Sequence, residues 1–169
     1  MKIGNQKINK FLEELGNSSP TPGGGAVAAL VGAMAASLVE MVANLTIGKK
    51  GYEKQQKDIE ILRYKAIKAK NELLELADED VLAFNQVMAA YKSKDKNRIR
   101  EALVYAIKIP GRTVKLSKDV AELAKEISKI GNKNAFSDAK SALHLAKAAV
   151  ESAKENIKIN KVALKSLNS

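Results

Sequence analysis

The chain contains no cysteine, no tryptophan and a single histidine, His144, among its 169 residues. Without cysteine it has no disulfide framework, no Cys/His zinc site and no catalytic Cys–His pair. A chain without thiols also suits the reducing cytoplasm, where we expect the protein to act. His144 points away from the apolar side of its predicted helix, so we interpret it as a surface residue without a catalytic role.

Aromatic residues are also scarce, at 4% of the chain, and proline occurs three times. The net charge of +10 favours anionic partners, although lysines spread along every segment equally fit a solvated surface. The scattered Phe and Tyr residues offer no platform for stacking bases, so we expect no nucleic-acid partner. The first sixteen residues lack the apolar core and cleavage site of a secretory signal. The length fits one domain over residues 1–169.

Ala, Leu, Ile, Lys and Glu dominate the composition, and apolar residues recur every three or four positions, a pattern that predicts helices. Pro110 has no backbone N–H and is expected to break or kink the helix that reaches it. The predicted helices cover about Ile3–Leu15, Gly24–Thr46, Tyr52–Tyr91, Asn97–Ile109, the segment after Pro110 to Ile130, and about Ser137–Leu167. Five or six long helices joined by short loops predict an all-α antiparallel bundle.

The second predicted helix belongs to a segment without any charged side chain from Gly23 to Val39. This is close to the ~20 residues of a membrane span, but it follows two prolines and is rich in alanine rather than leucine. Its small residues recur every four positions and leave one face almost without side chains, namely Gly24, Ala28, Gly32 and Ala36. We therefore expect a buried, Gly/Ala-rich central helix within a homodimer, and no membrane partner.

The glycines that open this helix, Gly23, Gly24 and Gly25, could form an anion cradle at a helix N-terminus. No strand precedes them and no Lys-Ser/Thr pair follows, so they do not form a P-loop. A loop that lets a flat ligand approach the backbone remains open as an interpretation.

Acidic residues on an apolar helix face are the most informative polar positions. Asp80 lies within roughly 60° of the apolar stripe of its helix at about 100° per residue; that stripe consists of Leu62, Ala69, Leu73, Ala77, Phe84, Val87 and Tyr91. Asp78 points almost the opposite way. Loss of hydration raises a carboxyl pKa, so Asp80 is a candidate proton carrier, with a buried structural aspartate as the alternative.

Amides occupy similar positions on other helices. Asn156 and Asn160 are four residues apart on the apolar side of the last helix, and Asp138 projects to the same side at its start. They could specify the register of the bundle or form a hydrogen-bonding wall for a heteroaromatic ligand. Glu40 and Asn44 are similarly spaced at the polar end of the second helix.

Several stretches resemble the formiminotetrahydrofolate cyclodeaminase / methenyltetrahydrofolate cyclohydrolase family. They are "PTPGGGAVAALVGAMAASLVEMVANLTIGKKGYE", "DEDVLAFNQVM", the "IP" before Gly111, "GNKNAFSDA" and "NIKINKVALKSL", in the family's order and over nearly the whole chain. The resemblance implies an all-helical homodimer that binds a folate in a groove near the subunit interface. It also implies an acidic catalytic residue in "DED", for which our geometry favours Asp80 over Asp78.

The family catalyses two reactions, and the resemblance does not choose between them. The first is cyclodeamination of 5-formiminotetrahydrofolate to 5,10-methenyltetrahydrofolate and ammonia, towards which we lean. The second is hydrolysis of the methenyl compound to 10-formyltetrahydrofolate. Both need proton transfer but neither a metal nor another cofactor. We expect Gly23–Gly25, Asn156 and Asn160 to hold the pterin, and Lys49 and Lys50 to bind the carboxylates of a polyglutamate tail; Asn44 and Asp138 complete the predicted binding set. A non-catalytic basic helical module is the competing interpretation.

Overall fold

The computed structural model describes residues 2–167, and within this range all regular secondary structure is helical. The α-helices are α1 (Ile8–Leu15), α2 (Gly24–Asn44), α3 (Gln56–Ser93), α4 (Lys96–Ile130) and α5 (Phe136–Ser166). Short 3-10 helices cover Ile3–Asn5 (η1), Glu53–Gln55 (η2) and Lys133–Ala135 (η3). The predicted all-α class is confirmed, with four long helices in this part of the chain.

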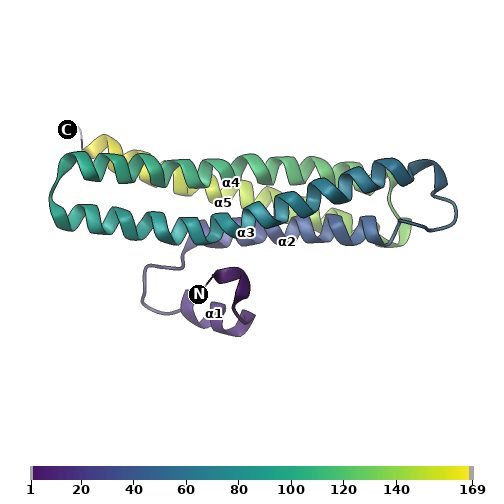
Figure 1. Cartoon of the computed structure of the whole chain (residues 1–169), viewed down its shortest axis with the longest axis horizontal. Helices are drawn as coiled ribbons and strands as arrows, with labels where there is room; N and C mark the ends of the chain where they lie inside the picture. The colour runs from purple at the N-terminus through teal and green to yellow at the C-terminus, as the bar shows by residue number, and fades with distance from the viewer. Residues whose placement is uncertain (1, 168–169) are drawn as a thin grey trace.

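Helices α2 to α5 lie side by side along the long axis of the molecule, and each runs opposite to the one before it (Figure 1). Helix α2 is in contact with α3, α4 and α5. It has 21 residues, whereas α3, α4 and α5 have 38, 35 and 31. As a consequence α2 accompanies its neighbours over little more than half of their length, and it begins beside the middle of α3 and α5.

Close packing of α2 depends on its small residues. A Cβ at Gly32 would lie 2.8 Å from Ser117 Oγ and 3.2 Å from Leu73 Cδ1, so a larger residue would force these side chains of α4 and α3 to shift. Ala29 and Ala36 are fully buried. By length and composition α2 could cross a membrane, but 56% of its most apolar window is buried against the other helices, as in the core helix of a globular protein.

Pro110 does not break a helix. It lies inside α4, which runs without interruption from Lys96 to Ile130, so the predicted fourth and fifth helices are one. A proline leaves the carbonyl four residues earlier without its helical donor. Here that carbonyl belongs to Ala106, and Asn160 Nδ2 on α5 donates a hydrogen bond to it at 2.9 Å. The side chain of a neighbouring helix thus replaces the backbone donor that proline removes.

The loop after α2 is held by hydrogen bonds to the start of α3 and to the α4–α5 connection. Asn132 N donates to Thr46 Oγ1 at 2.8 Å, and Asn132 Nδ2 donates to Leu45 O at 3.0 Å. Gly48 N donates to Gln56 Oε1 at 2.8 Å. These bonds fix the path of the α2–α3 loop at the end of the molecule.

The N-terminal segment is attached mainly through η1. Ile3 N donates to Asp78 Oδ1 on α3 at 2.7 Å. The predicted first helix is divided into η1 and α1, because α1 begins only at Ile8. Helix α1 contains no buried residue. Its apolar residues Ile8 and Leu12 are 74% and 57% exposed.

Candidate active site

The carboxyl group of Asp80 lies against the first turn of α2. Asp80 belongs to α3, and the backbone N–H of Ala26 donates a hydrogen bond to its side chain. Gly23 is the N-cap residue of α2, and Gly24 and Gly25 are its first two residues. The start of a helix is the positive end of its dipole and carries N–H groups without helical acceptors. Asp80 therefore faces a polar, positively polarised turn from an otherwise apolar helix face.

Glycine is required at position 25 by this contact. A Cβ there would lie 2.5 Å from both Cγ and Oδ2 of Asp80, well inside van der Waals distance. Any larger side chain would displace the carboxyl group from the start of α2. The glycine run of the sequence thus provides the space that the acid occupies.

The electrostatic environment of Asp80 is dominated by burial. Burial raises the pKa of its carboxyl group from 3.8 to about 6, although the hydrogen bond from Ala26 acts in the opposite direction. Within residues 2–167 no lysine or arginine forms an ion pair with this group. A carboxyl group that titrates near neutrality can both accept and donate a proton under physiological conditions.

Asn156 approaches the same turn of α2 from α5. Its Nδ2 lies 3.7 Å from the position that a Cβ of Gly24 would take, and it donates to Ser152 O at 3.0 Å. Ser152 Oγ makes a long hydrogen bond of 3.5 Å to Gly24 O. The first turn of α2 is therefore flanked by an acid from α3 and by an amide and a hydroxyl from α5.

The two aspartates of the "DED" sequence have different surroundings. Asp78 accepts the hydrogen bond from Ile3 N and so anchors the N-terminal segment. Glu79, between them, forms an ion pair with Arg112 on α4 at 2.7 Å. Only Asp80 faces the start of α2, which makes it the stronger catalytic candidate.

Three predicted binding residues lie at the far end of α2. Asn44 is the last residue of the helix, and Lys49 and Lys50 follow in the loop. At about 1.5 Å per residue, they lie roughly 30 Å from Gly24 along the helix. Lys49 and Lys50 line a cavity of about 330 Å³, and Asn44 Oδ1 accepts a hydrogen bond from Arg63 Nη1 at 3.3 Å.

Asp138 is likewise distant from the amides with which it was grouped. It lies in the first turn of α5, roughly 27 Å before Asn156 at about 1.5 Å per residue. Asp138 and Asn156 share a helix face but not a place along it. Asn160 lies one turn beyond Asn156, with one amide hydrogen bonded to Ala106 O. Within one chain the predicted residues therefore form two groups, one at each end of α2.

Sequence reasoning missed two groups at the start of α2, the hydroxyl of Ser152 and the backbone N–H of Ala26. Ser152 precedes Asn156 by one helical turn on the same face, and this spacing could have identified it. The backbone donor has no signal in the side-chain pattern.

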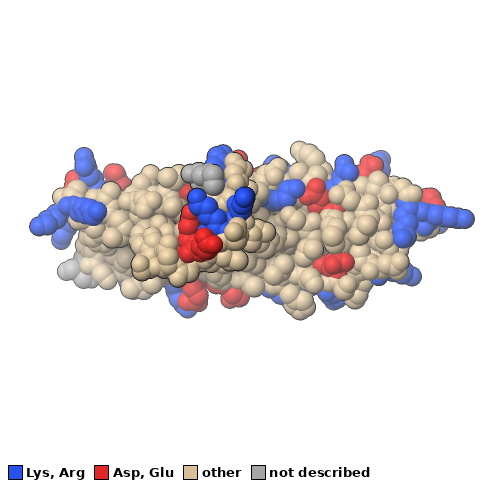
Figure 2. Space-filling model, turned by 90° about the horizontal axis from the view of Figure 1, so that it is seen from below, with Lys and Arg blue, Asp and Glu red and all other residues tan. Residues whose placement is uncertain are grey.

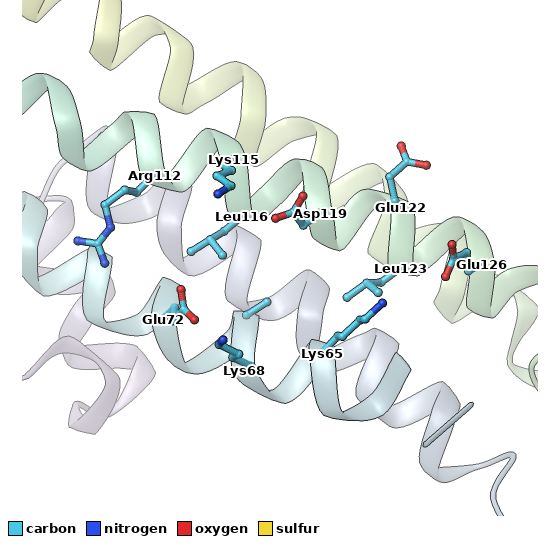
Figure 3. Close-up of a pocket in the computed structure, with 11 residues that line it drawn as sticks. Lys65, Lys68, Glu72, Arg112, Lys115, Leu116, Asp119, Glu122, Leu123 and Glu126 are labelled. Atoms are coloured by element: carbon cyan, nitrogen blue, oxygen red, sulfur yellow. The ribbon is translucent and has the colours of Figure 1, made fainter. Parts of the chain in front are cut away.

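A separate cavity of about 590 Å³ lies between α3 and α4 (Figure 3). Its charged lining residues are balanced in sign, with Lys65, Lys68, Arg112 and Lys115 against Glu72, Asp119, Glu122 and Glu126. Neither Asp80 nor Asn156 lines it, so it is not the candidate active site. Among residues 2–167 no group of three His, Asp or Glu side chains is placed to hold a metal ion.

Comparison with known proteins gives consistent matches. Residues 7–168 match the family model described as formiminotransferase-cyclodeaminase. The chain is 40% identical over 126 residues to methenyltetrahydrofolate cyclohydrolase from Methylorubrum extorquens, a match that covers 69% of this chain and 61% of that enzyme. It is 30% identical over 123 residues to formimidoyltransferase-cyclodeaminase from Rattus norvegicus, covering 68% of this chain and 22% of that protein. The matches thus span about three fifths of the first relative and about a fifth of the second.

A solved structure is similar over almost the whole chain. The crystal structure of formiminotetrahydrofolate cyclodeaminase from Thermotoga maritima superposes with a TM-score of 0.92 at 36% identity. The match covers 98% of this chain and 84% of that one. The two proteins therefore share the arrangement of helices that brings Asp80 to the start of α2.

Proposed function

The chain belongs to the formiminotransferase-cyclodeaminase family, and we propose that it is a folate one-carbon enzyme, a formiminotetrahydrofolate cyclodeaminase. The observation that carries this proposal is the half-buried carboxyl group of Asp80, with a pKa of about 6, against the glycine-rich start of α2. Similarity to a solved formiminotetrahydrofolate cyclodeaminase supports the same reaction.

Cyclodeamination needs one proton to move from one nitrogen to another. N10 of the folate attacks the carbon of the protonated formimino group, and a bond forms between them. The Asp80 carboxylate takes the proton from N10 and gives it to the amino group, which leaves as ammonia when its bond to carbon breaks. The product is the 5,10-methenyl cation, and the carboxylate is regenerated. A pKa near 6 suits both steps, because the acid and base forms are then close in energy.

Methenyltetrahydrofolate cyclohydrolase activity is the second candidate, favoured by the 40% identity to the Methylorubrum extorquens enzyme. In that reaction Asp80 takes a proton from water while the water oxygen bonds to the methenyl carbon. The bond from carbon to N5 then breaks, and 10-formyltetrahydrofolate and a proton are released. The same carboxyl group therefore serves either reaction. The two reactions differ in the nucleophile that attacks the carbon, which is N10 in cyclodeamination and water in hydrolysis.

The substrate is held by groups around the start of α2 in this proposal. Gly23–Gly25 allow the flat pterin to approach the backbone, and Asn156, followed by Asn160, supplies amide groups for its ring. The reacting carbon is already activated in both substrates, so the proposal includes no cofactor. The enzyme acts as a homodimer in the cytoplasm, without a nucleic-acid or membrane partner.

Lys49 and Lys50 bind the carboxylates of a polyglutamate tail in this proposal, and the net charge of +10 attracts such substrates. Lys50→Ala should raise KM for a polyglutamylated substrate more than for the monoglutamate. If Lys50→Ala left KM for the polyglutamylated substrate unchanged, tail binding by Lys50 would be contradicted.

The proposal is tested by measuring turnover of 5-formiminotetrahydrofolate and 5,10-methenyltetrahydrofolate side by side. Asp80→Asn preserves shape and removes the proton carrier, so it should lose turnover of both by about 100-fold or more. Asp119→Asn, at an exposed position of α4, is the control for the loss of one charge. A fully active Asp80→Asn would refute the catalytic role. A wild type inactive on both substrates would refute the enzyme and favour a non-catalytic basic helical module.

A further inference from the structure

Pro110 stands at a position where a proline is unfavourable for the helix. Proline is the least favourable residue in a helix interior, because it has no N–H and its ring crowds the preceding turn. Pro110 is nevertheless buried inside α4. Residues that break a local rule of this kind are found mostly at functional sites. The neighbour that uses the missing N–H, Asn160, is one of the predicted binding residues, which indicates such a role for Pro110.

Asn160 bonds to the carbonyl that Pro110 leaves without a helical donor. Its Nδ2 donates to Ala106 O on α4 at 2.9 Å. Asn156, one turn earlier on α5, donates instead to Ser152 O of its own helix at 3.0 Å. Asn160 reaches across to the neighbouring helix rather than back along its own. The carbonyl of Ala106 is the better acceptor, because no backbone N–H competes for its oxygen.

The bond to Ala106 O determines which end of the Asn160 amide faces α4. The torsion that turns an amide group is broad, so an asparagine without a fixed partner can present either its nitrogen or its oxygen. A carbonyl oxygen accepts hydrogen bonds but donates none, so only the Nδ2 end can face it. Oδ1 and the second N–H then point in fixed directions. Within residues 2–167 neither is hydrogen bonded to another residue, so both are available to a ligand.

Asn160 lies where a ligand can reach it. Asn156 is beside Gly24 in the first turn of α2, and Asn160 is one turn further along α5. Because α5 runs opposite to α2, Asn160 lies beyond the start of α2, where α3, α4 and α5 continue without it (Figure 1). Asn160 is half-buried. Its amide is therefore held by α4 and still accessible.

Charged groups give little orientation to a ligand near the start of α2. Asp80 has no ion-pair partner in the described part of the chain. Seen from the side of α1 and α2, the molecule shows uncharged surface between separate charged groups (Figure 2). A neutral, flat ring bound there is oriented by hydrogen bonds, which are directional. The direction in which each amide points therefore determines how well the ring is held.

We propose that Pro110 is a positioning residue of the substrate site and acts through Asn160. By removing one backbone N–H it leaves Ala106 O to Asn160, and this bond holds the amide oxygen of Asn160 ready to accept a hydrogen bond from the ligand. A pterin carries N–H donors on its ring nitrogens and its exocyclic amino group, so it has the required chemistry. The role in substrate binding rests on the proposed function, whereas the coupling between Pro110 and the orientation of Asn160 does not.

Steady-state kinetics with the better of the two folate substrates tests the positioning role. Pro110→Ala restores a backbone donor to Ala106 O, so it should raise KM by about 2- to 10-fold, as for one lost hydrogen bond, and change kcat by less than about twofold. Asn160→Ala should raise KM at least as much. The double variant should equal Asn160→Ala alone, because Pro110 acts only through that side chain. An unchanged KM for Pro110→Ala, or effects that multiply in the double variant, would overturn the positioning role.

A packing control separates this role from a general disturbance of α4. Ile109→Val removes buried volume beside Pro110 without adding a hydrogen-bond donor, so it should keep the wild-type KM. The assay temperature is one at which thermal unfolding shows every variant to be folded. If Ile109→Val raised KM as much as Pro110→Ala, the effect would be one of packing and the positioning role would be overturned.

The side-chain amide protons of Asn160 test the coupling without any substrate. In isotopically labelled protein their nuclear magnetic resonance signal is assigned by its absence from Asn160→Ala. The proton bonded to Ala106 O should exchange slowly with water in the wild type. In Pro110→Ala its exchange rate should approach that of Asn97, at an exposed position of α4.

Equal exchange of this proton in wild type and Pro110→Ala would overturn the coupling between Pro110 and Asn160. A wild type that turns over neither folate would overturn the proposed function instead. The exchange measurement would in that case still decide whether Pro110 orients Asn160.

Discussion

Asp80→Asn should make the folded protein more stable at neutral pH while removing activity. Burial raises the pKa of Asp80 from 3.8 to about 6, so the folded state disfavours the charged form. Between these two values the native state binds a proton that the unfolded state has released. Stability from this group is therefore fully present below pH 3.8 and is lost as the pH rises through 6. An amide at position 80 has no charge to desolvate and avoids that loss.

The size of the effect follows from the pKa difference. One pKa unit corresponds to about 1.4 kcal/mol, so the wild type loses at most about 3 kcal/mol relative to the variant between low and neutral pH. Roughly half of this difference falls between pH 5 and pH 8. For a chain of this length, 1 kcal/mol changes Tm by about 2–4 °C. The Tm advantage of Asp80→Asn should thus increase by about 3–6 °C from pH 5 to pH 8.

Urea or thermal unfolding of both proteins at pH 5, 6, 7 and 8 measures this directly. Asp119→Asn is the control, because it removes one negative charge at an exposed position from the same chain of net charge +10. Subtracting its effect isolates the contribution of burial. Parallel stability profiles of wild type and Asp80→Asn would show that the carboxyl group is well solvated and would refute the electrostatic basis of the proposed mechanism.

Three other predictions concern the surroundings of the same site. Asn160→Ala should destabilise the protein by about 1–3 kcal/mol, because it leaves Ala106 O unpaired; Pro110→Ala restores a helical donor to that carbonyl, so urea unfolding of the four proteins of the cycle should show a smaller cost of Asn160→Ala in that background. Gly25→Ala should reduce kcat by about 10-fold or more by displacing the acidic side chain, whereas Gly111→Ala, with no atom within 4 Å of its Cβ, should leave kcat unchanged. The pH profile of kcat/KM should fall below about pH 6, as the base is protonated, and a flat profile from pH 5 to 8 would contradict this.

Helical periodicity predicted the long helices and the side of α3 on which Asp80 lies. Both depend on local spacing, and the face of a helix follows from residue number alone. The limit of helical periodicity appears on α5, where Asp138 and Asn156 share a face but lie roughly 27 Å apart. Periodicity gives direction around an axis, and only the path of the whole chain gives position along it.

Pro110 illustrates a second limit. The rule that proline ends a helix assumes that nothing replaces the missing N–H. Asn160, fifty residues later in the chain, supplies the donor, and α4 continues through the proline. No local pattern around Pro110 contains this information. The exposed positions of α2, Met34 and Leu45 among them, were likewise hidden by the overall apolar character of the helix, since its exposed side is known only once its neighbours are placed.

The short length of α2 divides the molecule into two unlike halves. Along the length of α2, large hydrophobic clusters form around it. On the other side of its N-terminus, where α3, α4 and α5 continue without it, the described residues form a small buried cluster of Ala90, Ile99 and Leu103. Resistance to local unfolding should therefore fall from one half to the other, and amide hydrogens should exchange faster in the thinner half. Asp80 lies at the boundary between the two halves, so a ligand bound there would contact both the more stable half and the half that unfolds locally more easily.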